Sequence, residues 1–218
     1  MGESGSGKST AIKCLYFDQE PTRGEALFYD EGTEYSLFKL NKARQRSLCN
    51  QRFGMVYQNP HLGLNFDISA GGNIAERLLM SNVSHYENIR ERAVSLLSRT
   101  EVLSERMDEM PKNFSGGMQQ RVQIAKALVT NPPLLLLDEV TTGLDLSVQA
   151  AILDLILEIQ QQSQTSMIVV THDLGVIRLL ADRTLVMKYG RIIETGLTDQ
   201  ILEDPQQAYT QRLVASAL

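Results

Sequence analysis

The sequence predicts an α/β fold in which a parallel-sheet core is interrupted by an inserted helical subdomain. Three observations predict it. A glycine-rich segment opens the chain, helical apolar spacing dominates its middle, and short apolar runs alternate with helical segments toward its C-terminus. With 218 residues and a hydrophobic content of 43%, the chain can form one domain with a sizeable inserted lobe.

The core is predicted from the two ends of the chain. In the N-terminal part we expect a helix at residues 8–15 and strands at 24–29 and 53–57. In the C-terminal part we expect strands at 134–137, 167–170, 184–187 and 191–194, and helices at 147–161 and 174–180. The four leucines at 134–137 are typical of a strand buried on both faces.

The helical subdomain is predicted from apolar residues that recur every three or four positions. They do so at residues 73–80, 86–97 and 118–129, and the run Asn131-Pro132-Pro133 ends the last helix. We therefore divide the single domain, residues 1–218, into an α/β core at 1–65 and 130–218 and a helical subdomain at 66–129.

The composition argues against some classes of function and some cellular locations. A net charge of −5 argues against a general nucleic-acid binder, which usually presents a basic face. Cys14 and Cys49 have no metal or redox spacing, so we expect reduced thiols in a cytoplasmic protein. No apolar run is long enough to span a bilayer, so any attachment to the inner face of the cell membrane would go through a partner.

The opening segment Gly2-Glu3-Ser4-Gly5-Ser6-Gly7-Lys8-Ser9 spells a phosphate-binding loop. Its three glycines allow positive φ and a close approach of backbone N–H groups to phosphates. Lys8 should reach the β- and γ-phosphates, and the Ser9 hydroxyl should bind Mg²⁺. We assign Gly2, Gly5, Gly7, Lys8, Ser9 and Thr10 to the nucleotide site. A coincidental glycine-rich turn is the alternative.

Two carboxylates follow the leucine strand, at the end where open α/β sheets bind ligands. Asp138 would hold Mg²⁺, and Glu139 would orient or deprotonate the attacking water. The alternative is an acidic strand end with no catalytic role. This alternative is less favoured because a phosphate-binding loop precedes the strand in the chain.

A second helix start also has the features of an anion site. Ser115, Gly116 and Gly117 directly precede a helix, so free N–H groups would be accessible there. A plain Ser N-cap is the alternative, although two consecutive glycines exceed what a cap needs. Two such helix starts in one chain require two nucleotides, or two chains that share them.

Together these segments resemble the ATP-binding cassette of the ABC superfamily. The resemblance covers nearly the whole chain: Gly2–Ser9 matches the Walker A motif, 134–139 Walker B, Phe114–Met118 the signature, Gln58 the Q-loop, 142–145 the D-loop and His172 the H-loop. It implies a P-loop NTPase (RecA-like) parallel-sheet core with an inserted α-helical subdomain, and a function in binding and hydrolysing ATP with Mg²⁺.

The resemblance also implies how the site is completed. Two cassettes pack head to tail, and the signature residues Ser115, Gly116 and Gly117 of one contact the γ-phosphate held by the other. Gln58 is implied to sense Mg²⁺ and the attacking water. His172 is implied to contact the γ-phosphate beside Glu139, and Asp145 to lie at the dimer interface. For Asp145, capping of the following helix is the alternative.

Within the family, several segments are similar to the ATP-binding subunit of the phosphonate carbon–phosphorus lyase system, namely 69–74, 114–121, 144–150, 171–176, 196–199, 204–205 and 209–211. Its implied partners are a second cassette and the lyase core complex. The first alternative is the ATPase of an oligopeptide or dipeptide importer, whose partners are membrane permeases. Two further alternatives are a nucleic-acid-associated cassette of the DNA-repair type and an inactive interaction module. We expect no direct nucleic-acid binding.

Members of the family carry an antiparallel sheet, an adenine-stacking aromatic residue and a central strand ahead of Walker A. Because the loop begins at Gly2, we expect these N-terminal strands to be missing from the sequence. A missing central strand leaves both neighbouring strands with unpaired edges. We therefore expect the chain alone to bind ATP poorly or to aggregate.

Overall fold

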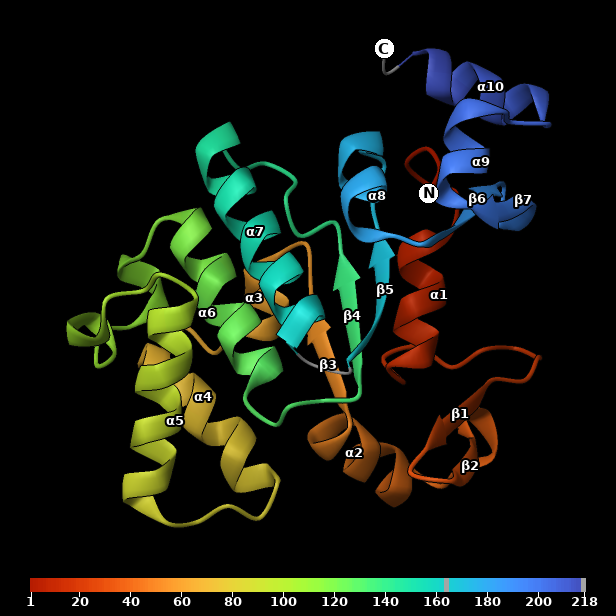
Figure 1. Cartoon of the computed structure of the whole chain (residues 1–218). Coiled ribbons are helices and arrows are strands. Elements are labelled where there is room, and N and C mark those ends of the chain that lie inside the picture. The colour runs from red at the N-terminus through yellow and green to blue at the C-terminus, as the bar shows by residue number, and fades with distance from the viewer. Residues whose placement is uncertain (163–164, 217–218) are drawn as a thin grey trace.

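A computed structural model describes residues 1–162 and 165–216. A central sheet separates a group of helices on one side from two β-hairpins on the other (Figure 1). The sheet holds β3 (Phe53–Val56), β4 (Leu134–Asp138) and β5 (Ser166–Val170) in the order β3-β4-β5, all parallel. The fold class read from the sequence is thus confirmed.

Strand β4 is buried along its whole length, as its leucines predict. Its residues alternate between two hydrophobic cores. Leu135 and Leu137 pack with Ile152 from α7 (Leu146–Gln162), whereas Leu136 packs with Ile12 from α1 (Lys8–Leu15). Because both faces are covered by helices, the C-terminal end of β4 is the only part of this strand that can present polar groups to a ligand.

The helical subdomain consists of α4 (Ala70–Met80), α5 (Tyr86–Arg99) and α6 (Gly116–Leu128), which share a core of their own. The predicted helix at 118–129 starts two residues earlier, because Ser115 caps it by accepting a hydrogen bond from the Met118 N–H. Helix α6 also faces the sheet, since Ile124 belongs to the core around Leu135.

The remaining elements surround the sheet. Two antiparallel hairpins are β1 (Leu27–Asp30) with β2 (Thr33–Ser36), and β6 (Arg183–Lys188) with β7 (Arg191–Leu197). The other helices are α2 (Lys42–Gln51), α3 (Pro60–Gly63), α8 (Leu174–Leu180), α9 (Thr198–Glu203) and α10 (Ala208–Ala215), with short 3₁₀ turns at Leu37–Lys39, Ser104–Arg106 and Pro111–Asn113. None of these helices is long and apolar enough to cross a membrane in the part of the chain that is described.

An apolar cavity of about 640 Å³ separates β5 from β6. Among the described residues no strand pairs with β5 on that side, and Ile168 on β5 is 38% exposed. On the other side Met1 pairs with β6, because its amino group donates to the Leu185 carbonyl and its carbonyl accepts from the Met187 N–H at 2.8 Å. Burial in this cavity lowers the pKa of the Met1 amino group to about 6.

Candidate functional site

The glycine-rich segment forms a tight loop that leads directly into α1. Gly5 and Gly7 adopt left-handed φ values of 78° and 99°, and Gly7 is the N-cap of α1. Gly2 has φ of 146°, and a Cβ atom at Gly2 would lie 2.2 Å from the Met187 carbonyl oxygen. The glycines at these positions are therefore required by the backbone path of the loop.

Lys8 lies at the centre of this loop. Its Nζ donates to the carbonyl oxygens of Gly2 at 2.7 Å and Glu3 at 2.9 Å, and the residue is only 6% exposed. Nζ lies 4.0 Å from Glu139 Oε1. A buried ammonium held mainly by neutral carbonyls is placed to bind an anion that enters the loop.

The two residues predicted to bind Mg²⁺ lie next to each other. Ser9 Oγ donates to Asp138 Oδ1 at 2.8 Å, which joins the start of α1 to the end of β4. Burial raises the pKa of Asp138, an effect that the hydrogen bond from Ser9 opposes. A buried carboxylate and a hydroxyl are hard oxygen donors, so this pair fits Mg²⁺. No cluster of three or more His, Cys, Asp or Glu residues suited to a metal occurs among the described residues, and Mg²⁺ commonly completes its shell with phosphates and water.

Glu139 occupies an unusual backbone position. Its φ is +46°, a left-handed value that non-glycine residues rarely adopt, and its N–H donates to the Val170 carbonyl at 2.8 Å. This bond ties the residue after β4 to the end of β5. The side chain is 14% exposed. Such local strain is most often retained at functional positions.

Three side chains converge on the Glu139 carboxylate. Gln58 Nε2 donates to Oε2 at 3.2 Å, and Thr142 Oγ1 donates to the same oxygen at 3.3 Å. His172 Nδ1 lies 3.5 Å from Oε1. Gln58 follows β3, Glu139 follows β4 and His172 follows β5, so the ends of three neighbouring parallel strands supply the cluster.

The sequence assigned Thr142 to the D-loop but did not identify it as a neighbour of Glu139. It lies in an exposed turn, and threonine in a turn carries no signal that distinguishes a catalytic neighbour from an ordinary turn residue. Thr10, which we assigned to the nucleotide, lies exposed on α1, one residue after Ser9.

The signature residues are not part of this cluster. Ser115 caps α6, and no hydrogen bond joins residues 115–117 to the loop 1–9 in the described parts of the chain. A Cβ added at Gly116 would have no atom within 4 Å, whereas a Cβ at Gly117 would lie 2.7 Å from Val148 Cγ1. Close packing against α7 therefore explains Gly117, and only Gly116 is unexplained by packing.

Asp145 likewise has a structural role in the single chain. Its Oδ1 accepts from the Val148 N–H at 3.0 Å and from Ser147 Oγ at 2.6 Å, and these bonds lower the pKa of Asp145. It thus caps α7, which is the alternative role that the sequence allowed. A role at a dimer interface stays a prediction.

These motifs have counterparts in known proteins. The sequence model of a family described as "ABC transporter" matches residues 1–142. The chain belongs to the ABC transporter family. The family hydrolyses ATP, so the chain is an ATP-binding cassette and an ABC-type ATPase.

The similar proteins include a phosphonate-utilization protein and peptide-transport proteins. The putative phosphonates utilization ATP-binding protein PhnK of Escherichia coli (strain K12) is 48% identical over 218 residues, which are 100% of this chain and 85% of PhnK. The oligopeptide transport ATP-binding protein OppD of Bacillus subtilis (strain 168) is 41% identical over 227 residues, which cover 99% of this chain and 61% of OppD. The chain thus spans less than two thirds of this peptide-transport relative.

Solved structures of ATP-binding cassettes have a similar fold. The ATP-binding cassette MJ0796, in a dimeric post-hydrolysis state bound to ADP and Pi, matches with a TM-score of 0.81 and 30% identity, covering 91% of this chain and 83% of that one. CbiO1 from Clostridium perfringens, part of the transporter complex cbiONQ, matches with a TM-score of 0.78 and 28% identity over 94% of this chain and 78% of its own.

Proposed function

We propose that this ATPase is the ATP-binding subunit of a phosphonate carbon–phosphorus lyase system. The observation that carries the proposal is the 48% identity to PhnK, which extends over 100% of this chain and therefore includes its C-terminal elements. The identity to OppD is lower, at 41%. Partner-specific features are expected in the parts that differ between relatives of one catalytic family.

The site geometry supports a hydrolytic mechanism based on Glu139. Loop N–H groups and Lys8 would hold the phosphates of ATP. Ser9, Asp138 and Gln58 would hold Mg²⁺. The ion would stabilise the negative charge of the phosphates. Glu139 would accept a proton from the attacking water, and the hydrogen bonds from Gln58 and Thr142 to its Oε2 would hold it in position. His172 would hold Oε1 and contact the terminal phosphate.

We further propose that two cassettes share each ATP. In the single chain, Ser115 and Gly116 lie at a helix start that no side chain blocks, since Gly116 has open space around it. The match to a dimeric cassette supports a second cassette as the partner that receives this helix start. Either a second copy of this chain or a related cassette would serve as that partner.

The ATPase of an oligopeptide or dipeptide importer is the second candidate, favoured by OppD and by the dipeptide transport protein DppF of Escherichia coli (strain K12), which is 37% identical over 99% of this chain. Affinity purification of the tagged chain from cells grown on a phosphonate separates the two. The first proposal predicts that lyase subunits co-purify from the cytoplasmic fraction. Recovery of permease subunits from the membrane fraction instead would favour the importer.

A further inference from the structure

The phosphate loop is held by elements from the other end of the chain, since β6, β7, α9 and α10 lie beside the N-terminus (Figure 1). The Glu3 N–H of the loop donates to the Tyr209 hydroxyl at 3.0 Å, across 206 positions of the sequence. Tyr209 is the second residue of α10, is 8% exposed, and shares a hydrophobic core with Met1 and Val186. A buried tyrosine hydroxyl usually finds a hydrogen-bond partner, so this bond assigns a role only through what it holds.

The peptide unit between Gly2 and Glu3 connects this bond to Lys8. A trans peptide unit is planar, so its N–H and its C=O point in opposite directions. The N–H of this unit donates to Tyr209, and its C=O, on Gly2, accepts from Lys8 Nζ at 2.7 Å. A rotation of the unit that breaks one of these bonds therefore breaks the other. The next carbonyl, on Glu3, accepts from Lys8 Nζ at 2.9 Å.

Tyr209 is itself fixed in place. The Glu194 carboxylate of β7 accepts from the N–H groups of Gln206 at 2.7 Å and Gln207 at 3.2 Å, directly before α10 begins. Lys188 Nζ lies 4.5 Å from the centre of the Tyr209 ring, which is a cation–π contact. The hydroxyl is therefore presented to the loop by a helix whose start is anchored to a strand.

The hairpin of β6 and β7 contacts the loop a second time. The Gly190 N–H at its tip donates to the Ser6 carbonyl at 3.0 Å. A Cβ atom at Gly7 would lie 3.5 Å from Gly190 Cα, so the tip packs on the loop. These contacts involve only the backbone of both segments. The bond to the Glu3 N–H instead depends on one side-chain hydroxyl, which a phenylalanine would lack.

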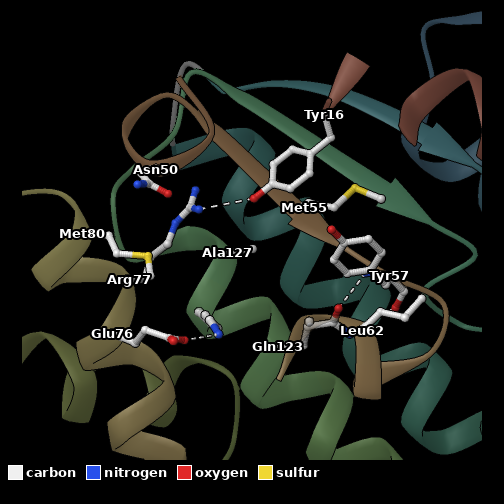
Figure 2. Close-up of a pocket in the computed structure, with 12 residues that line it drawn as sticks. Tyr16, Asn50, Met55, Tyr57, Leu62, Glu76, Arg77, Met80, Gln123 and Ala127 are labelled. Carbon is white, nitrogen blue, oxygen red and sulfur yellow. Dashed lines mark hydrogen bonds and ion pairs between the residues drawn. The ribbon is translucent and has the colours of Figure 1, made fainter. Parts of the chain in front are cut away.

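The opposite side of the site is held in a similar way by α6. The Tyr57 N–H donates to Gln123 Oε1 at 2.7 Å, and the Tyr57 carbonyl accepts from Gln123 Nε2 at 3.1 Å (Figure 2). The next residue, Gln58, donates to Glu139. On both sides, a side chain outside the site fixes the backbone that leads to a residue of the site.

We infer that Tyr209 is a positioning residue for phosphate binding, because its hydroxyl holds the peptide between Gly2 and Glu3 in the orientation that places Lys8 Nζ in the loop. Without the hydroxyl the Glu3 N–H loses its acceptor, the peptide can turn, and Lys8 Nζ is held less firmly. The inference goes beyond the proposed function and requires only that the loop binds the phosphates of ATP.

The first test follows Lys8 in the full chain without nucleotide. Lysine side chains are acetylated with acetic anhydride, and mass spectrometry compares Lys8 with Lys13 of the same helix. In Tyr209→Phe the ratio of Lys8 to Lys13 labelling should rise about two- to tenfold. Tyr189→Phe, at the exposed tip of the adjacent hairpin, is the matched control and should leave the ratio unchanged. General loosening of α1 would raise the labelling of both lysines and leave their ratio unchanged.

A second measurement uses the natural chain alone, so it decides even if Tyr209→Phe does not fold. The Glu3 amide hydrogen should exchange with solvent about tenfold or more slowly than that of Ser4, after correction for intrinsic rates. The Ser4 N–H is the reference because it has no hydrogen bond to the residues that the structure describes. NMR resolves the two amides. Equal exchange of the two would overturn the inference.

The third measurement is the affinity for ATP, followed with a fluorescent analogue. Tyr209→Phe should bind about three- to tenfold more weakly than the natural chain, and Tyr189→Phe should bind equally. An unchanged labelling ratio in folded Tyr209→Phe, or an affinity within about twofold of the natural chain, would overturn the inference. Labelling and exchange need no nucleotide, so their failure is distinct from failure of the ATPase role, which would appear as absent ATP turnover.

Discussion

His172 Nδ1 lies 3.5 Å from Glu139 Oε1, so the first turns after β5 and β4 meet at one carboxylate oxygen. The other oxygen is held by Gln58 from the turn after β3. A single carboxylate is thus fixed from both sides by groups that rest on different strands. This arrangement leaves Glu139 little freedom to rotate, which favours a role that requires accurate placement of a base.

Replacing Glu139 by Gln should separate binding from hydrolysis. The amide keeps the size of the side chain but cannot accept a proton from water, so ATP turnover should fall by about 100-fold or more while ATP binding persists. Turnover is measured by phosphate release and binding by a fluorescent ATP analogue. Glu105→Gln, at an exposed 3₁₀ turn, is the matched control. Turnover within about twofold of the natural chain would remove Glu139 from this role.

The sequence predicted those parts of the fold and site that depend on local patterns. The leucines of β4 and the glycines of the phosphate loop identified their elements, because each pattern reflects a requirement of the local backbone. Helix α2 was not predicted, since only Leu48 of its residues is buried and its apolar periodicity is correspondingly weak. The contact of Thr142 with Glu139 could not be predicted either, because it depends on the geometry of the turn between them.

The paired glycines at the start of α6 should respond differently to alanine. In Gly117→Ala the new methyl would clash with Val148, a branched side chain that cannot easily turn away, and the chain should lose about 1–3 kcal/mol of stability. Gly116→Ala meets open space and should leave stability equal or slightly higher. Thermal denaturation checks both variants. If Gly116 contacts a nucleotide held by a second cassette, Gly116→Ala should still lower ATP-dependent dimerisation measured by light scattering.

Asp138 should destabilise the fold at neutral pH in the absence of Mg²⁺. Because burial raises its pKa in the folded chain, the folded state favours the protonated form, and stability is lost as the pH rises through the folded pKa. Asp138→Asn removes this charge and can still accept from Ser9, so its melting temperature should exceed that of the natural chain at pH 7.5. The difference should disappear near pH 4. A lower melting temperature for Asp138→Asn at pH 7.5 would contradict the argument.

Asp145 offers a way to distinguish helix capping from a role between cassettes. Asp145→Ala removes the acceptor for the Val148 N–H and should cost about 1 kcal/mol of stability. Asp145→Asn keeps a side-chain oxygen at the same place and should retain most of that stability while losing the charge. If Asp145→Asn nevertheless weakens ATP-dependent dimerisation, the carboxylate acts at the interface as well. Unchanged dimerisation would restrict Asp145 to capping.

Thr142 should help to hold the Glu139 carboxylate in place through its hydrogen bond to Oε2. Thr142→Val removes one of the two donors to this oxygen, so the base should be placed less accurately and ATP turnover, measured by phosphate release, should fall. Thr142→Ser keeps the hydroxyl and serves as the control. Because Gln58 still donates to the same oxygen, turnover at the optimum should fall by only about three- to tenfold. Turnover that stays unchanged when the hydroxyl is removed would mean that Thr142 merely completes its turn, and that Gln58 alone fixes this oxygen.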